Sequence, residues 1–223
     1  MSFTGRQQAR NLALTLRRYR GGMDALDWAG SAMVAARTRL EIATQNLANV
    51  TSDGFRKLTA RGTLTPFGVR VDAERSAQRG ALRRTERDYD LAIVGPGHFS
   101  VRDAGGRVVA TRDGSFERTV DGTLVDARGR TLLGRGGPLR VPERATIDER
   151  GHVVVDGSPT QQSIELANDA TLRSGFVETS AVDAIAEMVG IVAASRSYES
   201  AQKVVGAIDT IRQKNASDVA RVR

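Results

Sequence analysis

The sequence predicts an α+β fold, in which long N- and C-terminal helices pair as a coiled coil and a central antiparallel all-β domain lies between them. Two patterns lead to this prediction. Near both ends of the chain, apolar residues recur in alternating steps of three and four, which is the spacing of a helical seam. Between them, short runs rich in β-branched residues are separated by Gly, Asp and Pro turns, about 8–12 residues apart. No helical pattern interrupts these runs, which argues against a parallel sheet.

The N-terminal helix is predicted over residues 24–48, with Asp24 as its N-cap. Its apolar seam is about three heptads long and rich in alanine, so another helix can approach it closely. We predict that this seam contacts neighbouring subunits through Leu26, Ala29, Met33, Ala36, Leu40, Ala43 and Leu47.

The C-terminal helix is predicted over residues 181–222, with Ser180 as its cap. Val182, Ile185 and Val189 extend an apolar face upstream of its seam. The alternative is that both seams pack inside one chain, as most amphipathic helices do. We favour contacts between subunits, because a globular domain seldom places its two longest helices at the extremes of the chain. The predicted interface residues of this second seam are Ile191, Ala194, Tyr198, Ala201, Val205 and Ile208.

The central region is predicted to consist of short strands joined by tight turns. The strongest signal is Asp121-Gly122, because both turn residues tolerate positive φ. The glycine strings lack the spacing of a nucleotide-binding loop, and the Asp-Gly pairs lack the series of acidic residues that binds calcium. We therefore interpret them as turns. The expected strands are residues 90–94, 98–102, 107–111, 115–120, 123–125, 130–133, 139–141, 145–147 and 152–155.

The net charge of +7 is concentrated at the start of the chain. Residues 1–22 carry five arginines and no acidic residue, which leaves 28 basic and 26 acidic side chains in the rest. A basic nucleic-acid-binding module should carry its charge on the folded domain instead. That module is therefore an alternative with little support beyond the leader.

No residue pattern points to catalysis, a metal or a cofactor. The chain has no cysteine, its only histidines, His98 and His152, lie in predicted strands, and no G-x-S-x-G segment nominates a serine. No apolar run is long enough to span a bilayer, and the start lacks a signal-peptide pattern. We expect a protein that is not an enzyme and needs no cofactor. A small β-domain enzyme or carbohydrate binder is the remaining alternative, and it would need a polar pocket.

Four segments carry motifs that occur together in one known family. NLANVTSDGFRK at residues 46–57 combines an Asn-Leu-Ala-Asn helix end with a Gly-aromatic-basic turn. DLAIVGPGHFSV at 90–101, TRDGSFERTVDGTLVD at 111–126 and the helical stretch at 175–211 follow in order. Together they resemble the bacterial flagellar basal-body rod protein family of hook and rod axial proteins. The matching positions are Asn46, Leu47, Ala48, Asn49, Gly54, Phe55, Lys57, Gly175, Glu178, Ser180, Val182, Glu187, Met188, Arg196, Tyr198, Glu199 and Lys203.

The resemblance implies a structural rod subunit that transmits torque for motility. In that family, terminal helices of many copies pack into a tube, and the β-domain lies outside it. The implied partners are other copies, other rod and hook subunits and the flagellar type III export apparatus. The implied location is the periplasm-spanning basal body, reached without a cleaved signal peptide. The implied domains are a leader at 1–22, a polymerisation helix and turn at 23–57, a linker at 58–89, a β-domain at 90–174 and a polymerisation helix at 175–223.

Differences between this sequence and the usual family pattern indicate which member of the family it resembles. Residues 157–174 are brief and polar where the family usually carries a longer stretch, and the short linker argues against a hook protein. LLGRGGPLRVPERATI at 132–147 is most similar to the proximal-rod member, so we expect a proximal rather than a distal position. Met23 stands where the family normally begins, so we expect residues 1–22 to be an over-extended start or disordered. The alternative is a basic arm that contacts membrane or peptidoglycan.

Overall fold

The computed structural model describes residues 25–66, 68–167 and 169–221, with side chains up to residue 217. The predicted leader and the Asp24 cap lie outside the described residues. The rest divides into two compact units. The helical unit contains residues 25–43, 60–74 and 188–221, and the β unit contains residues 44–59 and 75–187. The predicted α+β class with an antiparallel β domain is confirmed.

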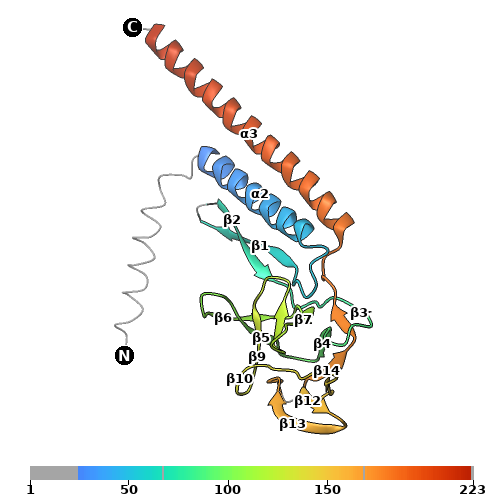
Figure 1. The fold of residues 1–223 in the computed structure, drawn as a ribbon. Coiled ribbons are helices and arrows are strands. Elements are labelled where there is room, and N and C mark those ends of the chain that lie inside the picture. The colour runs from blue at the N-terminus through green and yellow to red at the C-terminus, as the bar shows by residue number, and fades with distance from the viewer. Residues whose placement is uncertain (1–24, 67, 168, 222–223) are drawn as a thin grey trace, which may run out of the picture. The chain divides into compact units, whose positions relative to one another are not determined.

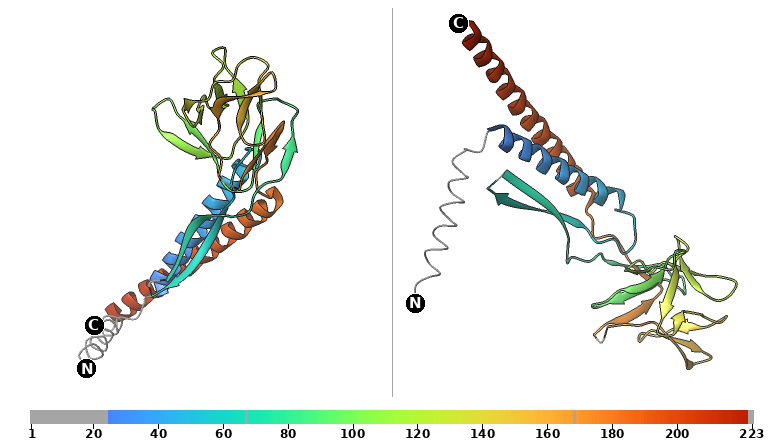
Figure 2. Two further views of the ribbon diagram at one scale, coloured as in Figure 1. Left: turned by 90° about the horizontal axis from the view of Figure 1, so that it is seen from below. Right: turned by 90° about the vertical axis from the view of Figure 1, so that its left-hand side faces the viewer.

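Two long helices and a hairpin form the helical unit. Helix α2 (Ala25–Ala48) and helix α3 (Ala184–Arg221) lie side by side and antiparallel (Figures 1 and 2). Close packing between them is possible at Gly190, where an added Cβ would lie 3.8 Å from the Cβ of Ala43. That α2 and α3 supercoil around each other with the knobs-into-holes packing of a coiled coil stays a prediction.

Residues 58–89, predicted as a linker, contain three strands. β1 (Leu58–Thr65) and β2 (Gly68–Arg75) form a hairpin, and β3 (Leu82–Arg84) follows. The hairpin contacts α2 through Ser31, whose Oγ accepts a hydrogen bond from the Val69 N–H at 3.2 Å. Its residues are mostly exposed, so the strands lack the regular apolar alternation from which a strand is predicted.

The β unit consists of small antiparallel sheets around one core. The largest sheet has the order β6-β5-β9-β8-β7, with β10 beside β9, and the others are β11-β12-β13, β14-β4 and β15-β3 (Figure 1). The bounds are β4 (Leu91–Val94), β5 (Phe99–Arg102), β6 (Val108–Thr111), β7 (Phe116–Arg118), β8 (Leu124–Asp126), β9 (Thr131–Gly134), β10 (Gly137–Pro138), β11 (Thr146–Ile147), β12 (His152–Val155), β13 (Ser158–Ser163), β14 (Thr171–Ser174) and β15 (Phe176–Glu178).

The core of the β unit is aliphatic with one aromatic pair. Phe99 and Phe116 meet edge to face with ring centroids 5.4 Å apart, a favoured aromatic geometry. Leu91, Leu124 and Leu132 around them are fully buried. Because each such side chain contributes about 1.5–3 kcal/mol on burial, this core suffices to hold many short strands together.

Eight of the nine predicted β runs contain a strand. The Asp121-Gly122 hairpin is confirmed, because β7 and β8 pair across it and Gly122 has φ of 79°. Residues 139–141 are not a strand, and only Arg140 forms an isolated bridge. The last three strands, β13 to β15, were not predicted. β14 pairs with β4, so the turn at Gly95 to Gly97 does not join two paired strands.

The start of α3 is capped by Asp183 and not by Ser180. The Asp183 Oδ1 accepts hydrogen bonds from the N–H groups of Ile185 and Ala186 at 2.9 and 3.2 Å, the contacts of an N-cap residue. Ser180 lies before the helix and accepts only from the Val182 N–H, at 3.4 Å.

Candidate functional site

Three of the predicted motif residues meet in one buried polar cluster, here called the root cluster. It consists of Asn46 near the end of α2, Lys57 and Leu58 after the following turn, and Glu187 in the first turns of α3. The Asn46 Nδ2 donates to the Leu58 carbonyl at 2.8 Å, and its Oδ1 accepts from the Leu58 N–H at 2.8 Å. The same Nδ2 donates to Glu187 Oε2 at 3.2 Å, and Lys57 Nζ lies 2.6 Å from Glu187 Oε1.

The chemistry of the root cluster requires an amide at position 46. Asn46 is fully buried, and it satisfies both the donor and the acceptor of one backbone residue, which only a side chain with both groups can do. Glu187 is buried as well, but Lys57 compensates its charge. The cluster therefore joins two segments that are 141 positions apart in the sequence.

A second buried cluster, here called the Arg112 hub, contains the motif residues Gly54 and Glu178. The Gly54 N–H donates to the Glu178 carbonyl at 2.6 Å, and Arg112 forms an ion pair of 2.6 Å with the Glu178 carboxylate. The two charged side chains are only 8% and 4% exposed. Arg112 also donates to the carbonyls of Gly97 and Ile93, at 3.0 and 3.3 Å, and of Gly95, so each of its three guanidinium nitrogens donates at least one hydrogen bond.

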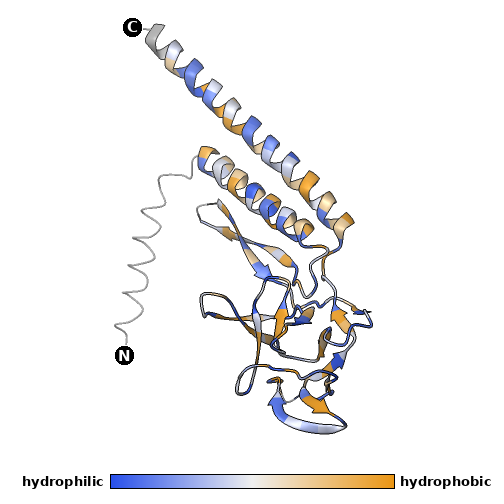
Figure 3. Ribbon diagram, viewed as in Figure 1, coloured by the Kyte–Doolittle hydropathy of each residue, from blue (hydrophilic) through white to orange (hydrophobic). Residues whose placement is uncertain are grey.

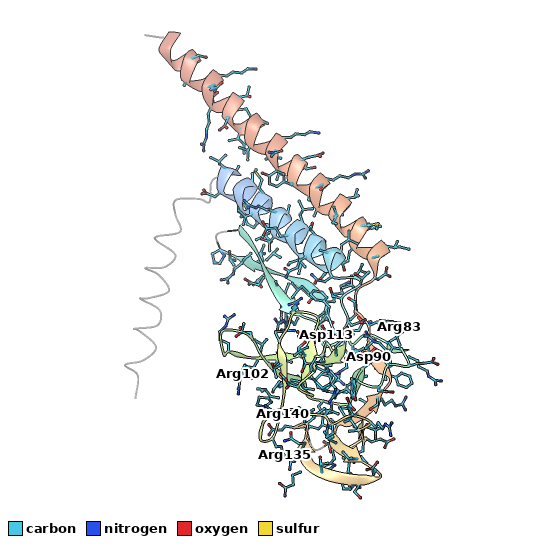
Figure 4. All side chains as sticks on the ribbon, viewed as in Figure 1. Arg83, Asp90, Arg102, Asp113, Arg135 and Arg140 are labelled. Carbon is cyan, nitrogen blue, oxygen red and sulfur yellow. The ribbon has the colours of Figure 1, made fainter. Side chains whose placement is uncertain are left out.

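The hub explains why the motif turn contains glycine. Gly54 has φ of +68°, and a Cβ there would lie 2.3 Å from the carbonyl carbon of Arg112 and from the nitrogen of Asp113. Burial raises the pKa of Asp113, although its carboxylate accepts a hydrogen bond from the Ser115 N–H. Beside this turn, Asp53 pairs with Arg83 at 3.0 Å. Figure 4 labels Arg83 and Asp113 among the side chains of the β unit.

The other motif residues have smaller roles or lie elsewhere. Asn49 donates from its side chain to the Gln45 carbonyl at 2.8 Å and so caps the end of α2, as expected of this residue. The Phe55 carbonyl accepts from the Ala181 N–H at 3.2 Å. Leu47 is half-buried and Ala48 exposed, while Arg196 and Tyr198 lie farther along α3, outside both clusters.

The predicted subunit-interface residues are the covered positions of both helices. Every alanine of the two seams is buried, and the larger seam side chains are half-buried; none is exposed. The structure of a single chain therefore covers much of each seam, as in the alternative that the seams pack inside one chain. Their contact with other subunits stays a prediction.

Of the three residues predicted to extend an apolar face upstream of the α3 seam, Val182 is half-buried and precedes the helix, whereas Ile185 and Val189 are exposed. Ile185, Met188, Val189 and Val192 are exposed, and Figure 3 shows the first turns of α3 as hydrophobic. Counting about 100° per residue places them on the face opposite the seam. The same count, applied to the sequence alone, could have separated the two faces.

Catalysis or metal binding by the described residues would be indicated by metal ligands, by histidines with acidic neighbours or by a polar pocket. They include no group of three or more His, Asp or Glu side chains that could hold a metal ion. His98 is exposed, and His152 lies 3.3 Å from Asp148. A pocket of about 300 Å³ in the β unit has Asp121 as the one carboxylate among its lining residues, whereas glycoside hydrolysis commonly uses a pair of carboxylates. The lining residues are Arg118, Asp121, Gly122, Arg140, Val141, Pro142, Thr160 and Gln162.

Two family profiles match parts of the chain. The profile "Flagellar hook protein FlgE/F/G D1 domain" matches residues 92–155, which lie in the β unit. The profile "Flagellar basal body rod FlgEFG protein C-terminal" matches residues 173–219, from the end of β14 through most of α3.

Curated relatives agree with these profiles. The flagellar basal-body rod protein FlgG of Caulobacter vibrioides is 28% identical over 86% of this chain and 97% of its own length. FlgF of the same organism is 27% identical over 86% of this chain and 95% of its own length. The hook protein FlgE of Rhizobium meliloti is 32% identical over 67% of this chain, but this match covers only 38% of the hook protein.

The fold and the comparisons together define a structural axial protein. Its buried polar clusters join chain segments, and its terminal helices lie side by side. The chain belongs to the flagellar basal-body rod family, whose members are structural rod and hook proteins of the flagellum. Neither α2 nor α3, over their described residues, is long and apolar enough to cross a membrane.

Proposed function

We propose that this chain is a subunit of the flagellar rod that self-assembles through its terminal helices and transmits torque. The observation that carries the proposal is the pairing of the two longest elements, which have 24 and 38 residues and come from opposite ends of the chain. A rod that transmits torque needs stiff elements shared by many subunits, and long helices supply them. The similarity to FlgG and FlgF proteins supports the same reading.

We further propose a role in assembly for the two seams. Their alanines allow α2 and α3 to approach closely, and their half-buried larger residues have surface left for a neighbouring subunit. In this proposal the seams hold the helix pair in one geometry and complete their burial when neighbours arrive. The export route through the flagellar type III apparatus and the periplasm-spanning location belong to the same proposal.

The proposed position is the proximal rod. Its support is the similarity of residues 132–147, which include most of β9 and all of β10 and β11, to the proximal-rod member. Relatives named FlgG and FlgF both match the chain, so this assignment depends on that segment alone.

The test begins with deletion of the gene, a swimming assay and electron microscopy of isolated basal bodies. We expect non-motile cells with rods truncated at the proximal level, and full rescue by the wild-type gene. Normal rods in the deletion strain would contradict the proposed function, and truncation above the proximal level would contradict only the position.

Charge substitutions in the seams test the route of assembly. Leu40→Asp and Val205→Asp each bury an unpaired charge in a covered seam, so both should abolish rod incorporation while the β unit stays folded. The control is Val120→Asp at a side chain that is 98% exposed on the β7–β8 turn, where motility should persist. Normal motility of both seam variants would refute the role of the seams.

A further inference from the structure

Helix α3 has a second face that the described residues of its own chain leave open. Ile185, Met188, Val189 and Val192 are 75%, 52%, 64% and 51% exposed. At about 100° per residue they fall within an arc of about 100°, directly opposite the covered seam. A helix that is apolar on two opposite sides needs a neighbour on each side.

The same outward face continues as a charged stripe. Arg196, Glu199 and Lys203 follow Val192 in steps of four, three and four, so they lie in the same arc, and all three are exposed. In the described part of the chain, neither Arg196 nor Glu199 has an ion-pair partner. The outward face of α3 thus presents an apolar end followed by alternating charge.

Helix α2 carries an outward face of matching character. Val34, Arg37, Glu41, Thr44 and Ala48 recur in steps of three, four, three and four, and all are exposed. Among the residues that the structure describes, Arg37 and Glu41 form ion pairs only with each other, 2.8 Å apart at the surface, and such an exposed pair can rearrange at small cost.

Charge complementarity selects the relative orientation of these two faces. In a parallel alignment that starts at Val34 and Val192, Arg37 meets Arg196 and Glu41 meets Glu199, so like charges oppose each other. In an antiparallel alignment, Arg37 lies opposite Glu199 and Glu41 lies opposite Arg196.

The antiparallel register also matches side-chain size. It brings the small Thr44 and Ala48 opposite Val192 and Met188 on α3, which leaves room for the larger apolar side chains. Antiparallel is also the orientation in which α2 and α3 lie within one chain.

We propose that the outward face of α3 docks antiparallel on the outward face of α2 of a second copy of this chain, with Arg37 opposite Glu199 and Glu41 opposite Arg196. The inference rests on the proposed function of a self-assembling subunit, and it identifies which surfaces meet and in which direction. Because the two faces belong to different helices, the contact is heterologous, and it can repeat from copy to copy as a rod requires.

Charge reversal tests the pairing in cells that lack the native gene. Glu199→Arg and Arg37→Glu should each lower swimming at least tenfold, because each places like charges in contact. The double variant Glu199→Arg/Arg37→Glu should restore swimming to near the wild-type level. A double variant as defective as the single variants would overturn the proposal.

Cross-linking tests the same contact directly, since the chain has no cysteine of its own. Arg37→Cys and Glu199→Cys copies, mixed under oxidising conditions that allow assembly, should form a disulfide-linked dimer. The control replaces Glu199→Cys by Gln202→Cys, an exposed position about a quarter of a turn away from the face, and should give little dimer.

Different results would contradict the α2–α3 contact between copies and the proposed rod function. A wild-type gene that rescues motility, together with no dimer from the mixed copies, would overturn this contact and leave the rod function standing. Normal rods in the deletion strain would instead remove the proposed function. When both cysteines are placed on one chain, a link within a monomer would overturn docking between copies.

Discussion

The root cluster allows a sharp test of what the family motif does, through the substitution Asn46→Asp. The change keeps the shape of the side chain but removes the Nδ2 donor and adds a negative charge. The Leu58 carbonyl loses its 2.8 Å hydrogen bond, and the new carboxylate lies about where Nδ2 now stands, 3.2 Å from Glu187 Oε2. The perturbation therefore combines a partly buried acceptor that loses its donor with a like-charge contact.

The magnitude follows from these two effects. A buried carbonyl that is left without a donor costs about 1–3 kcal/mol, and the partly buried Leu58 carbonyl should lie near the lower end of this range. Two carboxylates at this distance repel by about 5 kcal/mol at an effective dielectric constant of about 20. Lys57, 2.6 Å from Glu187, offsets part of the repulsion, and uptake of one proton limits the rest. We expect the free energy of unfolding to fall by about 3–5 kcal/mol at pH 7.

The loss of unfolding free energy in Asn46→Asp should depend on pH, which distinguishes a charge effect from a loss of packing. The like charge raises the folded-state pKa of the carboxyl pair above its unfolded value, so the folded variant binds a proton more readily than the unfolded chain. Its penalty is fully present above the folded pKa and declines as the pH falls through that value. The difference from wild type should therefore narrow between pH 7 and about pH 4.5.

The assay is urea unfolding of the full chain, followed by circular dichroism at both pH values. Gln45→Glu is the matched control, because it makes the same change from amide to acid at an exposed position one residue earlier, where we expect about 0.5 kcal/mol or less. A loss below about 1 kcal/mol for Asn46→Asp, or a loss independent of pH, would refute the role assigned to Asn46.

The Arg112 hub supports two further predictions, measured by the same urea unfolding. Arg112→Met leaves the buried Glu178 carboxylate without its cation and should cost about 3–5 kcal/mol, of which Glu178→Gln in the same chain should recover part. An additive double variant would contradict the ion pair. Gly54→Ala should cost about 2–4 kcal/mol, because its Cβ would lie 2.3 Å from the Arg112 carbonyl carbon at a φ of +68°. Gly136→Ala, with no atom within 4 Å of the added Cβ, should change stability by about 0.5 kcal/mol or less, and equal losses for the two glycines would contradict the close approach.

Local patterns were sufficient for the elements whose signals are short in range. The two terminal helices follow from apolar spacing, and the β7–β8 hairpin follows from Asp121-Gly122, where Gly122 adopts the positive φ of the turn. The hairpin β1–β2 was missed because most of its side chains face solvent, which removes the alternation on which strand prediction depends. The motif residues were found by resemblance, but the resemblance gave no physical reason for each of them.

The sequence by itself determined the α+β class, the two long helices and most of the strands, because these depend on spacing between residues close in the chain. Only the tertiary structure decided that Asn46, Lys57 and Glu187 form one cluster and that β14 rather than β5 pairs with β4. It also decided which face of α3 is covered. Periodicity shows which side chains share a face, but the neighbour that covers a face comes from a distant part of the chain. Because the hydrophobic effect is non-directional, an apolar face does not specify which segment will cover it.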